Sequence, residues 1–180
     1  MSVFTNPASA SAEEAAAYID AILELLGDRE PTTVLRATPS ALRNAAEGLS
    51  SAQLARPEKP GKWSIRHVLQ HLADSELVWG WRLRRVLARD RPRLTGFDQD
   101  RWADRLGYDQ TDATHALDEF SAFRASNLRL LERMAPADLE RVGVHAERGE
   151  ETVAHMMRLY AGHDLVHRRQ IERIRSAVVS

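Results

Sequence analysis

Two histidines four residues apart, His163 and His167, are the side chains of this chain best placed to do chemistry. On a helix, residues at that spacing project from one face. Neutral imidazole is the commonest protein ligand of zinc, nickel, copper and iron. The pair therefore indicates a metal site. An isolated pair at this spacing is common, however, and two solvated or hydrogen-bonded structural histidines are the alternative interpretation.

A third ligand would have to come from another segment, and His71 is the histidine we expect to supply it. Three histidines leave one tetrahedral position open, which distinguishes a catalytic metal site from a closed structural one. His167 also falls within the apolar stripe of the last predicted helix, where a polar ring needs a partner. The stripe consists of Val153, Met157, Tyr160, Ile171, Ile174 and Val178.

Four further histidines have weaker claims to a role in the site. His67 precedes His71 by one helical turn and either supports the site from behind or faces solvent. His145 lies in a polar connector that could approach the site, but an exposed ring is the favoured interpretation. His115 and His155 have no helical partner that would complete a ligand set, and both are expected to be exposed.

The composition limits the classes of function. The 180 residues are 43% hydrophobic and 28% charged, enough for one globular domain with its own core. A net charge of −1 argues against a nucleic-acid partner bound through a basic field. No cysteine is present, so any thiol chemistry needs a thiol cosubstrate. No leader pattern and no membrane-spanning run is found, and a cytoplasmic protein without a membrane partner is expected.

We expect residues 1–10 to be a flexible N-terminus and residues 11–180 to form a single helical bundle domain. The first helix should begin at a capping box formed by Ser11 and Glu14 and end at Gly27. A short helix should follow to about residue 48, with its N-cap at Thr38 and proline in the first helical position. The residues around Pro31 are assigned to the connector.

Three long helices should follow. Ser64 can cap the helix that carries His71, and Thr111–Asp112 can begin the next. The last helix should run from about Thr152 to about Ser176 and carry the histidine pair.

Residues 90–109 connect the helix that carries His71 to the helix that begins at Thr111–Asp112. This connection is long enough to be functional. It should contain at most a helical turn near Gln99–Arg105, and its aromatic residues Phe97, Trp102 and Tyr108 should shape a pocket. With no convincing strand pattern, even in the connector Arg141–Gly149, four apolar stripes predict an all-α four-helix bundle.

Three motifs resemble the DinB/YfiT-like family of metalloenzymes with four-helix bundles. They are Pro60–Arg66 (PGKWSIR), His71–Glu76 (HLADSE) and His163–Ile171 (HDLVHRRQI), and the pattern extends over most of the chain. The resemblance implies one divalent metal, zinc, nickel or iron, held by His71, His163 and His167. It also marks His67 as a departure, because an acidic residue is commoner at that position.

The resemblance implies a function as well. Characterised members of the family are thiol transferases or isomerases that use a low-molecular-weight thiol such as bacillithiol or mycothiol. The leading prediction is therefore a thiol-dependent S-transferase acting on a small electrophile. The alternatives are a metal-dependent hydrolase and a non-catalytic metal-binding stress-response bundle. No general base is assigned, because Asp74, Glu76 and Asp164 are each interpreted mainly as helix-surface charges.

Two partners are expected from the sequence. One is a small-molecule substrate. The other is a second copy of the chain, because Trp79 and Trp81 point to different faces of one helix and cannot both enter one core. A homodimer is therefore predicted.

Overall fold

The computed structural model describes residues 12–179 of the chain. The expectations for residues 1–10 and for the cap at Ser11 lie outside the described residues. The helices are α1 (Ala12–Leu26), α2 (Pro31–Ala46), α3 (Ser51–Ala55), α4 (Ile65–Ala88), α5 (Gln99–Arg105), α6 (Ala113–Leu131) and α7 (Val153–Val179), with single 3-10 turns at Tyr108–Gln110 and Pro136–Glu140. The strands are β1 (Arg93–Leu94), β2 (Val142–His145) and β3 (Gly149–Thr152).

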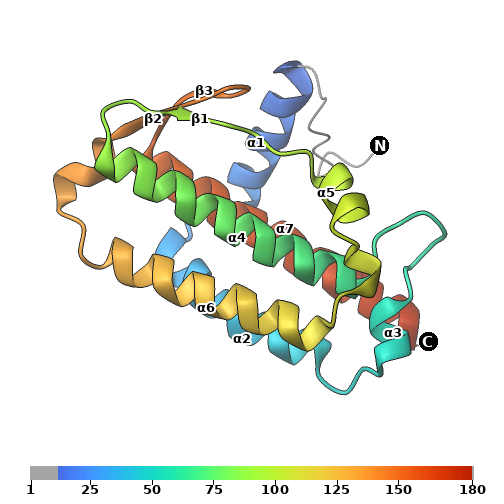
Figure 1. The fold of residues 1–180 in the computed structure, drawn as a ribbon. Coiled ribbons are helices and arrows are strands. Elements are labelled where there is room, and N and C mark those ends of the chain that lie inside the picture. The colour runs from blue at the N-terminus through green and yellow to red at the C-terminus, as the bar shows by residue number, and fades with distance from the viewer. Residues whose placement is uncertain (1–11, 180) are drawn as a thin grey trace.

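Four helices, α2, α4, α6 and α7, form the bundle (Figure 1). Helix α4 packs against α6 and α7, and α2 packs against the same two helices from the other side. Helix α1 packs against α7 outside the bundle. The predicted all-α bundle is confirmed, as is the long connection between α4 and α6. No helix within residues 12–179 is both long and apolar enough to cross a membrane.

The helix that carries His71 begins where its cap predicts. The Ser64 hydroxyl accepts a hydrogen bond from the backbone N–H of His67, and the helix begins at Ile65. Asp112 caps α6 in the same way, by accepting from the N–H groups of Thr114 and His115. Such caps satisfy backbone donors that lack a partner in the first turn of a helix.

The prediction for α2 was wrong, because the helix begins at Pro31 rather than Pro39. Glu30 caps it by accepting from the N–H of Thr33 at 2.8 Å. Pro39 lies inside the helix and has no N–H to donate to the carbonyl of Leu35 four residues earlier. A side chain of α6, Arg124, donates to that carbonyl instead, at 2.8 Å. The neighbouring helix thus replaces the hydrogen bond that proline removes.

The absence of strands was also wrongly predicted. Strand β2 pairs in parallel with β1 and in antiparallel with β3. The connector Arg141–Gly149 therefore contains the first strand and the turn of a hairpin. Strands of two and four residues are too short to show an alternating pattern. Gly143 allows the hairpin to pack closely, because a Cβ there would lie 2.5 Å from Leu94 Cδ1 and 2.8 Å from Val86 Cγ2. The hairpin turn is thereby held beside the bundle.

Polar residues divide the bundle core into two apolar clusters. One cluster takes Ile65–Ala73 of α4 and Ile171–Val178 of α7, and the other takes the second half of α4 and the first half of α7. Between them, α4 carries the buried polar residues Ser75 and Glu76 and α7 carries Asp164 and His167, while His71 lies at the adjoining end of the first cluster. The candidate site lies in this polar layer.

Candidate metal centre

The structure brings together the three histidines that the sequence singled out. His71 projects from α4 and His163 and His167 project from α7, and one ring nitrogen from each lies within 4.8 Å of the others. The Nε2 atoms of His71 and His163 are 3.2 Å apart. The ring centroids of His163 and His167 are 4.4 Å apart. The spacing of His163 and His167 places both rings on one face of α7, and α4 presents His71 to that face. These two features are sufficient to produce the cluster.

Burial makes these rings neutral. His71 is 1% exposed and His167 is 6% exposed. Burial lowers the pKa of His71 and of His163 well below the usual value, and the neighbouring histidines add to the effect. Burial also lowers the pKa of His167, to about 4. Neutral imidazole is the form that binds a metal, so the cluster has the protonation state that a metal site requires.

Hydrogen bonds orient the rings. Nδ1 of His167 lies 2.7 Å from Oε1 of Gln170, so the proton sits on Nδ1 and leaves the Nε2 lone pair free. Among the described residues, Nε2 of His71 has Ser75 Oγ at 3.4 Å and His163 Nε2 as its neighbours within hydrogen-bonding distance. Three neutral nitrogen donors converging on one point fit a divalent transition metal, and zinc, nickel and iron(II) all accept such ligands.

The other histidines lie outside this cluster. Nδ1 of His67 is 2.8 Å from Ser64 Oγ at the start of α4, and His115 is exposed and His155 half-buried. His145 contradicts the expectation of an exposed ring, because strand β2 buries it to 2% exposure. Its Nδ1 accepts a hydrogen bond from the backbone N–H of Glu147, in the middle of the hairpin turn, at 3.2 Å.

Two carboxylates interpreted as surface charges are in fact buried. Glu76 and Asp164 are each 1% exposed, and Arg124 binds both, at 2.8 Å and 2.6 Å. Asn127 donates to the other oxygen of Glu76 at 2.8 Å. Burial raises the pKa of Glu76. Because Glu76 belongs to α4 and Asp164 follows His163 on α7, Arg124 connects the two helices that carry the histidines.

The third carboxylate, Asp74, is half-buried and accepts a hydrogen bond from the hydroxyl of Tyr108. Burial raises the pKa of Asp74, although the bond from Tyr108 opposes the shift. Neither residue lines the cavity beside the histidines. Of the three aromatic residues expected to shape a pocket, only Phe97 lines it, and Trp102 packs on Phe97 with ring centroids 4.7 Å apart.

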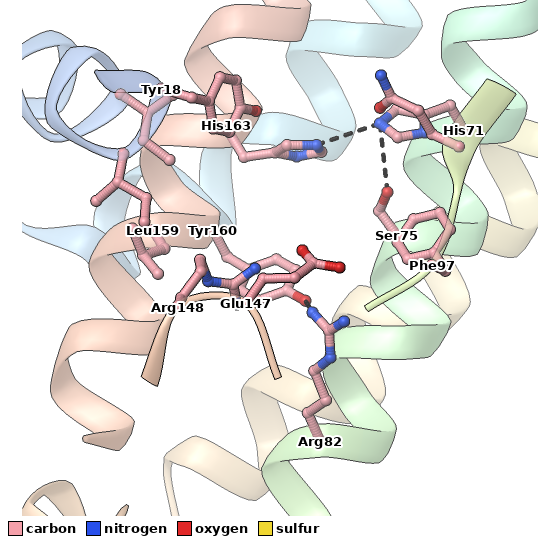
Figure 2. Close-up of a pocket in the computed structure, with 13 residues that line it drawn as sticks. Tyr18, His71, Ser75, Arg82, Phe97, Glu147, Arg148, Leu159, Tyr160 and His163 are labelled. Carbon is pink, nitrogen blue, oxygen red and sulfur yellow. Dashed lines mark hydrogen bonds between the residues drawn. The ribbon is translucent and has the colours of Figure 1, made fainter. Parts of the chain in front are cut away.

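A cavity of about 100 Å³ opens beside the histidines. Figure 2 shows His71, His163 and Ser75 at one end of it, Arg82 at the other, and Tyr160 between them. The remaining lining residues come from α1, the α4–α6 connection, the hairpin turn and α7, and they are Tyr18, Ile19, Ile22, Phe97, Gln99, Glu147, Arg148 and Leu159. Sequence reasoning gave no role to Arg82, Glu147, Arg148 or Tyr160, because no local motif joins them.

The fold and the site define a helical bundle with a candidate histidine metal centre on its facing helices. A family model described as the DinB superfamily matches residues 35–171. The chain belongs to this superfamily, as the motifs predicted.

Curated relatives share most of the chain. A protein of Oceanobacillus iheyensis is 29% identical over 72% of this chain and 74% of its own length, and one of Geobacillus kaustophilus is 30% identical over 82% and 83%. Each is named "Putative metal-dependent hydrolase". The solved structure of YfiT from Bacillus subtilis, described as a probable metal-dependent hydrolase with an unusual four-helix bundle topology, aligns with a TM-score of 0.74 at 23% identity. The alignment covers 94% of this chain and 90% of YfiT and shows a shared fold.

Proposed function

We propose that this chain is a metal-dependent hydrolase that cleaves a small molecule in the cavity beside His71 and His163. The observation that carries the proposal is the convergence of three neutral histidines, two buried and one half-buried, at one end of a cavity. The names of the relatives support hydrolysis and give no support to the thiol-dependent S-transferase that was the leading prediction. The hydrolase alternative therefore becomes the proposal.

The three histidines would hold the metal. A divalent metal bound by three imidazoles supplies a Lewis acid that polarises the scissile group and lowers the pKa of water. The chain would supply the proton acceptor. Among the described residues that line the cavity, Glu147 alone carries a carboxylate, and Figure 2 shows its side chain directed into the cavity.

The carboxylate of Glu147 occupies space that the missing side chain of Gly96 leaves open. This carboxylate packs against Gly96, where a Cβ would lie 2.4 Å from Oε1. Glu147 forms no ion pair with the described residues, so its oxygens are free to accept a proton. We assign it the role of general base, a role that commonly contributes about 10²- to 10⁴-fold to a rate.

The test begins with metal-free protein reloaded separately with zinc, nickel or iron(II). Each form is screened against carboxylic esters, amides and phosphate esters, with and without bacillithiol or mycothiol. We expect turnover without thiol, loss of turnover on chelation and recovery with one of the metals. Turnover that requires the thiol would instead identify the S-transferase, and stoichiometric metal binding without any turnover would identify a binding bundle.

Variants separate the roles of the residues. Replacing His71, His163 and His167 together by alanine should abolish both metal binding and turnover. Glu147→Gln should keep the metal but lower kcat by about 10²- to 10⁴-fold. His115→Ala is the matched control, because this ring is exposed and lies outside the cluster, and it should change neither property.

A further inference from the structure

The cavity contains a buried cation without a counter-ion. Arg82 of α4 is 5% exposed and lines the cavity. Its guanidinium donates to the hydroxyl of Tyr160 at 3.1 Å and to the backbone carbonyl of Thr95, both of which are uncharged. Its Nε is buried and has no hydrogen-bond partner among the described residues. Among residues 16–179, whose side chains the structure describes, no carboxylate forms an ion pair with it.

Two nearby arginines show the arrangement that a buried guanidinium ordinarily has. Arg124 binds two buried carboxylates, and Arg148, which also lines the cavity, is paired with the buried Glu151. A buried charge is costly unless an opposite charge accompanies it. Arg82 has no such partner among the described side chains, and an anionic group of a molecule that enters the cavity can supply one.

We propose that Arg82 binds an anionic group, a carboxylate or a phosphate, of the substrate. Arg82 lies at the end of the cavity opposite His71 and His163, and Tyr160 lies between them, its ring centroid 6.3 Å from that of His163 (Figure 2). An anion held by Arg82 directs the rest of the molecule toward the histidines. Guanidinium binds both anions through paired hydrogen bonds, and Figure 2 shows the two terminal nitrogens of Arg82 on the side that faces the cavity. Each has a second N–H besides the one that it donates to Tyr160 or Thr95.

The other charges of the cavity narrow the class of substrate. The charge of Arg148 is balanced by Glu151, so Arg82 and Glu147 remain as the uncompensated charges of the lining. Glu147 repels a second anionic group placed beside it. The substrate therefore has an anionic group at one end and an uncharged hydrolysable bond at the other. This identification rests on the proposed function, because it takes the cavity as the substrate site.

The experiment measures binding of small anions by calorimetry to the full-length, metal-loaded protein. The probes are benzoate and phenyl phosphate, whose ring suits the apolar wall formed by Ile22, Phe97 and Leu159, and benzamide is their uncharged counterpart. We expect one of the two anions to bind more tightly than benzamide, and the preferred probe identifies the anionic group. Equal binding of benzamide and both anions would overturn the proposal.

Two substitutions that each remove one positive charge test whether Arg82 binds the anion. Arg82→Gln should weaken anion binding by about tenfold or more, because a charge-assisted hydrogen bond is lost. Arg89→Gln removes the same charge at the exposed end of the same helix and should leave the affinity unchanged. Circular dichroism verifies folding. If Arg82→Gln does not fold, Arg82→Lys keeps the charge without the planar fork and should bind the anion several-fold more weakly. Unweakened binding by whichever Arg82 variant folds would refute the proposal.

Two measurements distinguish failure of this inference from failure of the proposed function. The variant in which all three site histidines are alanine should still bind the preferred anion through Arg82, although it cannot hold the metal. If that variant binds the anion and the wild-type protein hydrolyses nothing, the anion site stands and the hydrolase proposal fails. If hydrolysis occurs at equal kcat/KM for charged and uncharged substrates, the hydrolase stands and the role of Arg82 is refuted.

Discussion

Replacing Arg124 by methionine is the perturbation for which the structure predicts the largest effect. Arg124 is 1% exposed and donates to Glu76, Asp164 and the carbonyl of Leu35. Methionine fills a similar volume but donates nothing. The substitution leaves two carboxylates, each 1% exposed, without their cation.

The expected cost follows from these contacts. Breaking a buried ion pair by removing one partner costs about 3–5 kcal/mol, because the remaining charge stays buried. The unpaired Leu35 carbonyl adds a penalty of about 1–3 kcal/mol, which is not strictly additive. We therefore expect Arg124→Met to lower the free energy of unfolding by at least about 3 kcal/mol. Natural domains have about 5–15 kcal/mol in total, so the loss is a large share of the stability.

Urea denaturation followed by circular dichroism measures this loss. Arg43→Met is the matched control, because Arg43 pairs with Asp118 on the surface, where the side chains are 53% and 61% exposed. An exposed pair contributes about 0–1 kcal/mol. Adding Glu76→Gln and Asp164→Asn to Arg124→Met removes the unpaired charges and should restore part of the stability. A loss no larger than that of Arg43→Met, or no recovery in the combined variant, would refute the reasoning.

Three further outcomes are expected. Burial, aided by Arg148 and Arg82, lowers the pKa of His145 to about 4, so its neutral form stabilises the fold above the unfolded pKa of about 6.5. This contribution is lost as the pH falls from 6.5 toward 4. Because the pKa values of the three site histidines are lowered as well, His145→Gln should still lose stability between pH 7 and pH 5, but by about 2 kcal/mol less than the wild-type protein in urea denaturation. Chelation should lower Tm, since the metal binds only the folded state, and elemental analysis should find about one metal per chain. The predicted homodimer is checked by light scattering at micromolar concentration, where a monomer would contradict it; Trp79 is buried and Trp81 is 60% exposed.

The histidine cluster could be predicted because each helix that forms it shows in its own sequence which face is buried. The spacing of His163 and His167 fixes a common helix face, and the apolar stripes of α4 and α7 turn that face and His71 toward the core. The bundle class follows from the same stripes. The cap at Ser64 needs only the residues of the first helical turn, and it was predicted correctly for that reason.

The remaining features depend on residues far apart in the chain. Arg124 looks like any charged residue of a helix until Glu76 and Asp164 arrive from two other helices. Arg82 from α4 and Glu147 from a hairpin whose strands are too short to recognise line the same cavity. Distant contacts of this kind also reversed the interpretation of His145, which a strand pairing buries.

The start of α2 shows how one distant contact determines both the fold and the site. Proline inside a helix ordinarily costs about 3 kcal/mol, partly through the carbonyl left without a donor, so Pro39 predicts a helix start. Arg124 donates to that carbonyl of Leu35 with the same guanidinium that binds Glu76 and Asp164. One side chain of α6 thereby joins α2, α4 and α7, two of which carry the histidines. The same set of hydrogen bonds therefore supplies the donor that Pro39 lacks and holds together the two helices that carry His71, His163 and His167.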